Sequence, residues 1–542
     1  MSSSRPNTLA AASGIALLLI LITIELVGNF VEGVSLGERD MLFYPMYRTR
    51  QSMAVAISMM RSPPASGYLA YGSVSESLKS SGLEILDPDD DWIRRERLFH
   101  NTPALNKAIT DSLNVPLDAS LPLETIKGND LGYSDFIHLS FILFGPKVSS
   151  LYDFYFLLLL TSTLAFIAQF YRSRFLLLVL SAYMAVHLFL LVYCSSFGPP
   201  IGSIANDRTF TALGILPTLH LIAQLFDRGR VRPIVLATGL LQALLLAFVI
   251  SCRFEAMWEV AAILAVAGLV GVSLVLQART EPILRRARRL RSLWPAAFLV
   301  VILAGFHARV ELVTDSIYQN EAKTHIVWDS VLIGFLSNDS SLFQEYTGRD
   351  RSLWDKYVLS DELGCEAVKH YLRSKNDPRG SLIGGYDCDK GTFFYGGETG
   401  TYDRFARAVV FQMTWDHPLI VLKGLSWKYR QQMDMYYLHH TFTLANFQLP
   451  LACLLASVFV FWLAGGPPPI TPPGAARAVV AGSVLLCAAL ISPFISPSPF
   501  SIGSLATYLI FAAIGLAMTL IGCLGAATWL HHSLHARAPA AE

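Results

Sequence analysis

Charged residues are scarce in this chain of 542 residues. Asp, Glu, Lys and Arg together make up 15%, against about 25% in soluble domains. Hydrophobic residues make up 53%, and the mean hydropathy is +0.45. This composition excludes an ordinary soluble protein of several domains. The net charge of +1, without a surface of basic and aromatic residues, also argues against a nucleic-acid partner.

Motifs for nucleotide binding are missing as well. No glycine-rich run ends in Gly-Lys-Ser or Gly-Lys-Thr before a helix, and no dinucleotide fingerprint follows a strand. If the chain is an enzyme, it therefore works without ATP or a nucleotide sugar held in a domain of that kind. The sequence points to no particular cofactor and leaves a divalent metal open.

Long apolar runs dominate what is present. A spanning helix needs about 20 mostly apolar residues, and ten segments fit: 9–31, 148–171, 175–195, 209–226, 234–251, 256–277, 293–309, 447–464, 478–498 and 502–528. The first is longer than a signal-peptide core and has no small-residue cleavage site before Asn29, so it is predicted to be a retained anchor. The expected fold is an α-helical polytopic membrane protein of about ten transmembrane helices.

Arginine placement predicts the orientation. Lys and Arg concentrate in cytoplasmic loops, and three short loops carry arginines: 172–174, 228–232 and 279–291. Both termini then lie in the cytoplasm, and the long polar segments 32–147 and 310–446 lie outside. The predicted division is a transmembrane module over 1–309, an outer segment over 310–446 and C-terminal transmembrane helices over 447–542.

Cysteine is rare, with seven in the chain. Five lie in or beside predicted spans, and the other two, Cys365 and Cys388, share the second outer segment. An even number in an oxidising compartment favours a disulfide between them. The alternative is two free thiols, since neither cysteine has the spacing of a metal ligand.

The stretch Gly37-Glu38-Arg39-Asp40 lies just outside the first predicted span. Ionised groups this close to hydrocarbon are costly unless they face a water-filled cavity or a partner, so the stretch is a candidate site. The alternative is a solvated helix end with local ion pairs. Three further arginines, Arg208, Arg253 and Arg309, lie at the outer ends of predicted spans. They either line the same site or merely end their helices.

Interfacial helices are expected beside these spans. Residues 41–60 are too mixed to span, so they are predicted to lie in the membrane interface with Arg48 and Arg50 toward the headgroups. A second such helix over 136–144 should end at Gly145-Pro146, before span two. In the outer segment, a helix is predicted over 361–374 and a glycine-rich loop over 384–402. A third interfacial helix is predicted over 415–433.

This layout resembles the type C (GT-C) glycosyltransferase superfamily, which includes aminoarabinose transferases and protein mannosyltransferases. The resemblance lies in the acidic pair Glu38 and Asp40 after span one, the interfacial helix that follows, Phe144-Gly145 before span two, and His417-Pro418-Leu419 late in the chain. The chain departs from the family at Gly132-Tyr133-Ser134, where members often carry Lys-Pro-Pro or a similar proline pair.

The resemblance implies inverting transfer of a sugar from a polyprenyl-phosphate donor to a glycan or lipid acceptor of the cell envelope. Asp40, or Glu38 in second place, is then the general base. The lipid phosphate is expected to meet arginines, for which the candidates are Arg39, Arg48, Arg50, Arg208, Arg253 and Arg309. A bacterial inner membrane is the expected location. A non-catalytic envelope assembly protein and a lipid transporter are the alternatives.

Overall fold

The computed structural model describes residues 47–80, 102–126, 131–173, 207–227, 232–277, 291–318, 328–357, 361–377, 399–420, 422–424 and 479–484, with single positions between 176 and 187. The described part is mostly helical. The predicted spans 9–31, 447–464 and 502–528 lie outside it. Spans 175–195 and 478–498 are described only in part, so all five stay predictions.

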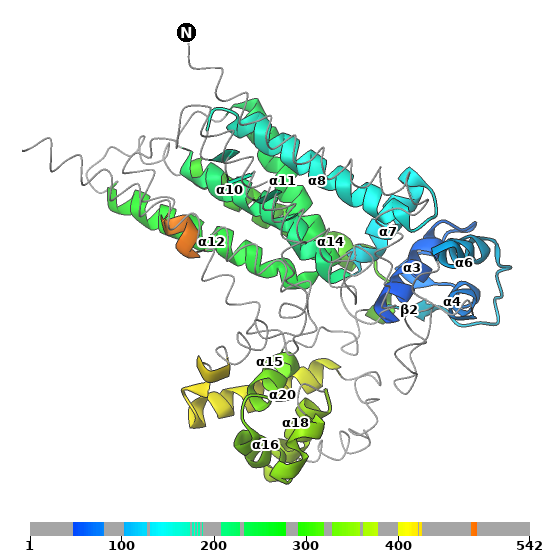
Figure 1. Ribbon diagram of the computed structural model, residues 1–542, viewed down its shortest axis with the longest axis vertical. Coiled ribbons are helices and arrows are strands. Elements are labelled where there is room, and N and C mark those ends of the chain that lie inside the picture. Colours follow the sequence, from blue (N-terminus) through cyan, green and yellow to red (C-terminus); the bar gives the residue numbers. More distant parts are fainter. Residues whose placement is uncertain are drawn as a thin grey trace, which may run out of the picture.

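Four helices in the described part are long and apolar enough to cross a membrane: α8 (Ser149–Phe170), α11 (Pro233–Cys252), α12 (Met257–Gln277) and α14 (Trp294–Val313). At 1.5 Å per residue each is about 30 Å long, the thickness of a bilayer core. They lie side by side in Figure 1 and match the predicted spans 148–171, 234–251, 256–277 and 293–309. The chain is therefore an integral membrane protein.

The ends of these helices follow from local sequence. Pro233 and Pro295 lie in the first turns of α11 and α14, where proline's missing N–H costs no hydrogen bond. Between α11 and α12 the chain turns through Arg253 and the short 3-10 helix η3 (Phe254–Ala256). A second one, η5 (Arg291–Leu293), precedes α14.

The span predicted over 209–226 is not one continuous α-helix. A 3-10 helix, η2 (Asp207–Gly214), leads into the shorter α10 (Ile215–Phe226). Pro217 lies in the first turn of α10, where it cannot donate a hydrogen bond to a preceding turn. Hydropathy registers the apolar run but not this change of helix type.

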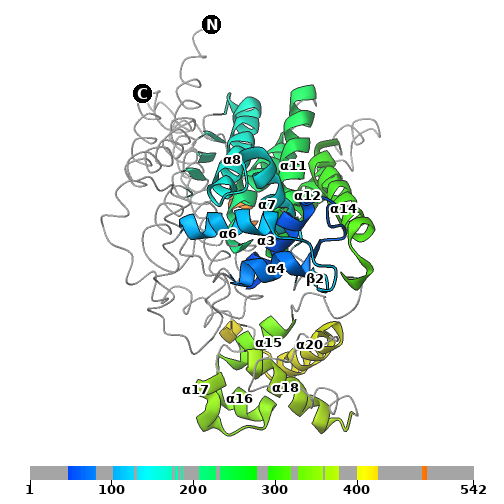
Figure 2. The ribbon, with the colours of Figure 1, turned by 90° about the vertical axis from the view of Figure 1, so that its right-hand side faces the viewer.

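The first outer segment forms a small layer at one end of the bundle (Figures 1 and 2). Its elements are α3 (Tyr47–Met59), β1 (Leu69–Ala70), α4 (Gly72–Leu78), α6 (Thr102–Asn114), β2 (Glu124–Thr125) and α7 (Gly132–Phe144). The two strands pair antiparallel, Leu69 with Thr125 and Ala70 with Glu124.

Within the described part of residues 41–60, the predicted direction of the arginines toward the headgroups is wrong at Arg50. The place of the helix relative to the membrane stays a prediction. The side chains of α3 from Arg50 to Ser58 are buried, and Arg50 is only 3% exposed. The helix packs against α7, α4 and β1. Arg50 therefore points into the protein. Elements distant in the sequence cover every face of the helix from Arg50 to Ser58, and a local sequence pattern cannot reveal such neighbours.

Helix α7 ends as predicted at the Gly145-Pro146 break. Gly145 has a φ of +92°, which a residue with a side chain rarely adopts, and α8 begins at Ser149. The first half of α7 is buried, whereas Leu139, Ile142, Leu143 and Phe144 are exposed. The core beneath it includes Phe136 against Phe154, with ring centroids 5.2 Å apart.

The second outer segment has a hydrophobic core of its own. It comprises α15 (Trp328–Leu336), α16 (Ser340–Thr347), η8 (Arg351–Leu353), α17 (Trp354–Tyr357), α18 (Asp361–Ser374) and α20 (Thr399–Asp416). The helix predicted over 361–374 is confirmed. The end of the loop predicted over 384–402 is instead helical, because α20 begins at Thr399; residues 384–398 lie outside the described residues. Asp339 caps α16 by accepting a hydrogen bond of 2.8 Å from the Ser341 N–H.

Candidate functional site

A polar cluster centred on Asp135 lies where α7, α14 and the chain before β1 meet. One oxygen of Asp135, Oδ2, accepts hydrogen bonds from the Tyr68 hydroxyl at 2.7 Å and from Nη1 of Arg309 at 2.9 Å. Asp135 is buried, whereas the Arg309 side chain is 48% exposed. The carboxylate is thus enclosed, and the guanidinium extends from it toward the surface.

Close packing holds α7 in this position. Gly132 begins the helix against the end of α11, where a Cβ would lie 2.5 Å from the backbone carbon of Ser251. The Cys252 thiol donates to the Gly132 carbonyl at 3.3 Å. Asp135 follows less than one turn later. The fit between Gly132 and α11 therefore sets where the carboxylate lies.

Tyr68 is held by the chain that follows α14. Gly67 and Tyr68 both have positive φ values, +71° and +60°, and the Asp315 N–H donates to the Gly67 carbonyl at 3.2 Å. The Tyr318 hydroxyl donates to the Tyr68 carbonyl at 2.8 Å and accepts from the Ile126 N–H at 2.8 Å. The 3-10 helix η6 (Ser316–Tyr318) thereby ties β1, β2 and α14 together.

The protonation states of the two tyrosines agree with the hydrogen bonds that they donate. Burial, with the negative charge of Asp135 beside it, raises the pKa of Tyr68, so the phenol stays protonated and donates. Burial also raises the pKa of Tyr318 to about 12. His138, one turn along α7, has a pKa lowered by burial, which the nearby Asp135 partly opposes.

The exposed group of the cluster is a cation, the guanidinium of Arg309. Oδ2 of Asp135 accepts from Tyr68 and from Arg309, so the carboxylate helps to orient that guanidinium. A guanidinium has five N–H donors, and the contact with Asp135 leaves others of Arg309 for an anion. Such a group is suited to bind a phosphate or a carboxylate at two points.

The structure describes only part of the predicted site. Glu38, Arg39 and Asp40 lie outside the described residues, as do the side chains of Arg48 and Arg208. Arg253, at the end of α11, is buried. Since α7 packs on α11 and α11 on α14, Arg253 and Arg309 lie at the same end of the bundle. Arg50 lies on α3, which packs against α7.

Sequence reasoning missed Asp135 and Tyr68. Asp135 directly precedes the interfacial helix predicted over 136–144 and lies in the first turn of α7. An acid beside an apolar run was the available signal. The sequence has no feature that marks Tyr68, whose role depends on a neighbour 67 residues away.

A second missed acid, Glu259, lies in the first turn of α12 and is fully buried. Its Oε2 accepts from the Thr218 hydroxyl at 3.2 Å. The carboxylate also fills the space beside Gly214, where a Cβ would lie 2.1 Å from Oε2. Glu259 thus joins α12 to α10.

Polar side chains in the apolar helices bind partners on neighbouring helices. Gln169 accepts from the Thr238 hydroxyl at 2.7 Å and lies 3.0 Å from Nε2 of His220. The Ser162 hydroxyl donates to Gln242 at 2.8 Å, and Tyr155 lies 3.1 Å from His187. Such pairs join helices in a membrane.

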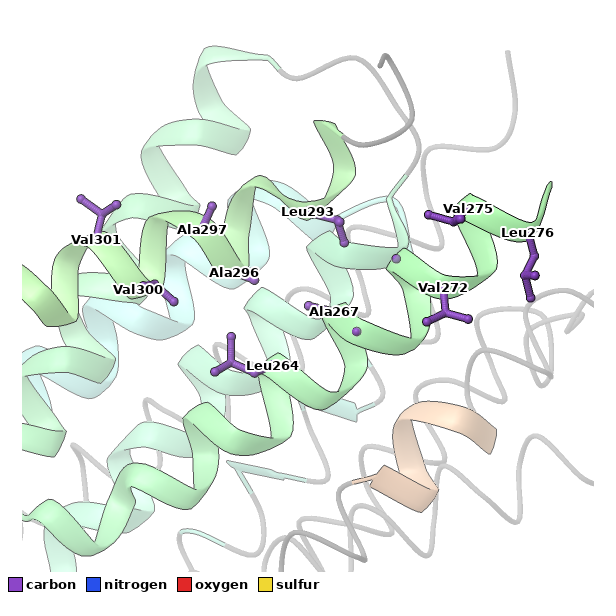
Figure 3. Close-up of a pocket in the computed structure, with 12 residues that line it drawn as sticks. Leu264, Ala267, Val272, Val275, Leu276, Leu293, Ala296, Ala297, Val300 and Val301 are labelled. Carbon is purple, nitrogen blue, oxygen red and sulfur yellow. The ribbon is translucent and has the colours of Figure 1, made fainter. Parts of the chain in front are cut away.

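An apolar groove of about 870 Å³ runs between α12 and α14. Figure 3 shows its lining, which comes from both helices and includes Leu264, Ala267 and Val272 on α12 and Ala296, Val300 and Val301 on α14. Gly268 and Gly271 add no side chain to the floor. Arg309 lies about two turns farther along α14 than Val301, about 12 Å at 1.5 Å per residue.

Within the described residues, no group of three or more His, Cys, Asp or Glu side chains is placed to hold a metal ion. Cys365 is buried in α18, and Cys388 lies outside the described residues. The bond between them stays a prediction.

Comparison of the chain with protein-family models, with curated proteins and with solved structures found no match.

Proposed function

We propose that the protein is a membrane glycosyltransferase that moves a sugar from a polyprenyl-phosphate donor to a glycan or lipid acceptor on the outer face of a bacterial inner membrane. The observation that carries the proposal is the position of Arg309. A half-exposed guanidinium, held by a buried carboxylate, stands at one end of a membrane helix whose other half borders an apolar groove.

An amphiphilic donor matches the combination of a cationic group at the end of α14 and an apolar groove beside the same helix. The phosphate would bind Arg309, and the first part of the polyprenyl chain would follow α14 into the groove between α12 and α14. The lining of the groove is almost wholly aliphatic, so it suits a hydrocarbon and not a sugar. The donor then needs no soluble nucleotide-binding domain, in agreement with the missing motifs.

The reaction balances with one base and no proton donor. Asp40 takes the proton from an acceptor hydroxyl while the hydroxyl oxygen forms a bond to the anomeric carbon. The bond from that carbon to the phosphate oxygen breaks, and polyprenyl phosphate leaves with the electron pair. Attack from the opposite face inverts the anomeric centre. The leaving phosphate is anionic, and arginine stabilises it.

To test this function, the purified protein is incubated with a panel of polyprenyl-phosphate sugars and the release of each sugar is measured. We expect the protein in lipid nanodiscs to release the sugar from at least one polyprenyl-phosphate sugar. In Arg309→Ala, donor binding should weaken by about 1.5–3 kcal/mol, the value of a charge-assisted hydrogen bond, or roughly 10- to 150-fold.

A matched control comes from the other end of the bundle. Arg172 follows α8, is exposed, and lies over the ring of Tyr171. Arg172→Ala removes the same charge at the predicted cytoplasmic end and should leave turnover unchanged. Failure of every donor in the panel, or equal loss in the two variants, would reject the proposed site.

A further inference from the structure

Helix α20 carries a second apolar face, on the side away from its own core. Ala406, Val409, Val410 and Met413 face inward and are buried. On the outer side Phe411, whose ring centroid lies 5.4 Å from that of Trp328, is 60% exposed, and Trp415 is 85% exposed. Leu419 and Leu422, which follow the helix, are exposed as well. We call these four exposed residues the outer stripe. Exposed apolar side chains gathered in this way mark a contact surface.

The composition of the stripe matches a membrane interface. Tryptophan is enriched at the level of lipid headgroups, where its amphipathic ring is stable. Exposed basic side chains stand at both ends, Arg407 one turn before Phe411 and Lys423 directly after Leu422. Basic residues of this kind attract anionic lipids.

Two acids near the end of α20 are bonded to side chains of the same segment. The Asp416 carboxylate accepts from the Tyr346 hydroxyl at 3.0 Å, and Glu345 lies 3.1 Å from Nε2 of His417. Both contacts join the end of α20 to α16. The negative charges nearest the stripe are thereby engaged within the segment.

The chain also keeps this segment close to a membrane. The candidate span α14 ends at Val313, and α15 begins at Trp328. A fully extended connection of this length reaches only about 50 Å. A bilayer surface is therefore always within reach of the stripe, without the entropy cost of bringing a free partner from solution.

We propose that the outer stripe rests on the bilayer surface at the end of α14, with Phe411 and Trp415 among the lipid headgroups and acyl chains. The interfacial helix predicted over 415–433 does not begin at Trp415, because residues 415 and 416 end α20 and the chain turns at 417–419. The proposed contact therefore lies on the end of α20 and the turn after it. This contact would fix the orientation of the second outer segment over the membrane. It is independent of the enzymatic proposal, because it needs no donor or acceptor.

Site-specific photocrosslinking of the full-length protein in native membranes tests the contact. The photoreactive residue p-benzoylphenylalanine replaces Phe411, Trp415 or, as a control, Gln344, an exposed polar position on α16. All three side chains are on the surface, so folding should be preserved. After irradiation, mass spectrometry identifies what is attached to each position.

We expect phospholipid adducts at positions 411 and 415 about tenfold above the control, because burial of an aromatic side chain favours the lipid-facing state by that factor or more. Adducts to peptides of this chain would show that another segment covers the stripe. Adducts to a second protein would identify a protein interface. Either result, or equal lipid yield at position 344, would overturn the proposal.

Discussion

Asp135 and Arg309 show how one residue pair can define the chemistry of a site. One oxygen of this buried carboxylate, Oδ2, accepts from both Tyr68 and Arg309, so Asp135 holds the guanidinium in place. The candidates for the general base come from the sequence and are Asp40 and Glu38. Asp135 is a positioning residue in the proposed mechanism.

Substitution of the two acids outside the described residues separates their roles. Asp40→Asn keeps the shape and removes the base, so turnover should fall by about 100-fold or more, the lower end of what general-base catalysis contributes. Donor binding should change little, because arginines hold the phosphate. If Glu38→Gln is inactive while Asp40→Asn is active, Glu38 is the general base and Asp40 is not. If both variants transfer sugar normally, neither acid is the base.

The burial of His138 should make the folding stability of the protein depend on pH. Burial lowers its folded-state pKa, so the unfolded chain takes up a proton first as the pH falls. Folding stability is then lost as the pH drops through about 6.5, the unfolded value. Thermal unfolding midpoints between pH 7.5 and 5.5 should fall more in the wild type than in His138→Gln. Parallel curves for the two proteins would show that His138 does not contribute.

Some residues of the candidate site could be predicted from the sequence and others could not. Arg309 was found because a charged residue at the end of an apolar run stands out. Asp135 and Tyr68 were not, since their hydrogen bonds join segments far apart in the chain. Glu259 escaped attention because the hydroxyl that it meets, Thr218, lies on another helix.

Among the elements, the long helices were the most predictable. Composition alone determines that α8, α11, α12 and α14 are apolar over about 30 Å, and the Gly145-Pro146 break separates α7 from α8. Predictions that required knowledge of neighbours were less successful. Helix α3 contains two arginines and several small polar residues, a pattern typical of a surface, yet α7, α4 and β1 cover it. The change from η2 to α10 depends on local backbone geometry that hydropathy does not measure.

The contact between α7 and α11 should be sensitive to one methyl group. In Gly132→Ala, the new Cβ would lie 2.5 Å from the backbone of Ser251, so α7 must shift, at a cost of about 1–3 kcal/mol for an overpacked position. Asp135 would move with the helix, and donor binding should weaken as well. Thermal unfolding and donor binding measure the two effects.

Gly268 provides the matched control for that substitution. It lies within α12, and a Cβ there would meet no atom within 4 Å. Gly268→Ala should leave stability unchanged or raise it by up to about 1 kcal/mol, because alanine favours a helix. If both variants unfold at the wild-type temperature, the packing of Gly132 does not hold α7.

At the scale of the whole molecule, the structure places four candidate spans and two separate hydrophobic cores. Any further spans fall in segments wholly or partly outside the described residues. Their prediction rests on the hydropathy of the sequence and the placement of arginines. Orientation in the membrane likewise comes from the sequence, through the positive loops. The divisions predicted at about residues 310 and 446 likewise stay predictions from composition.

Reporter fusions test that orientation. A reporter joined after Arg291 should be cytoplasmic, and one joined after Ser374, the last residue of α18, should be outside. Between these points the chain crosses once, through α14. Reporters on the same side would contradict the topology and, with it, the argument for a lipid-linked donor at the outer face.

The most direct test of the proposed site is the binding of polyprenyl phosphate, the product that retains the phosphate and the hydrocarbon chain. Native mass spectrometry of the protein from nanodiscs can count bound lipid in the wild type, Arg309→Ala, Asp135→Asn and Arg172→Ala. We predict that the first two variants lose affinity by roughly 10-fold or more, while Arg172→Ala binds as the wild type does. Equal binding by all four proteins would contradict the assignment of Arg309 as the phosphate contact.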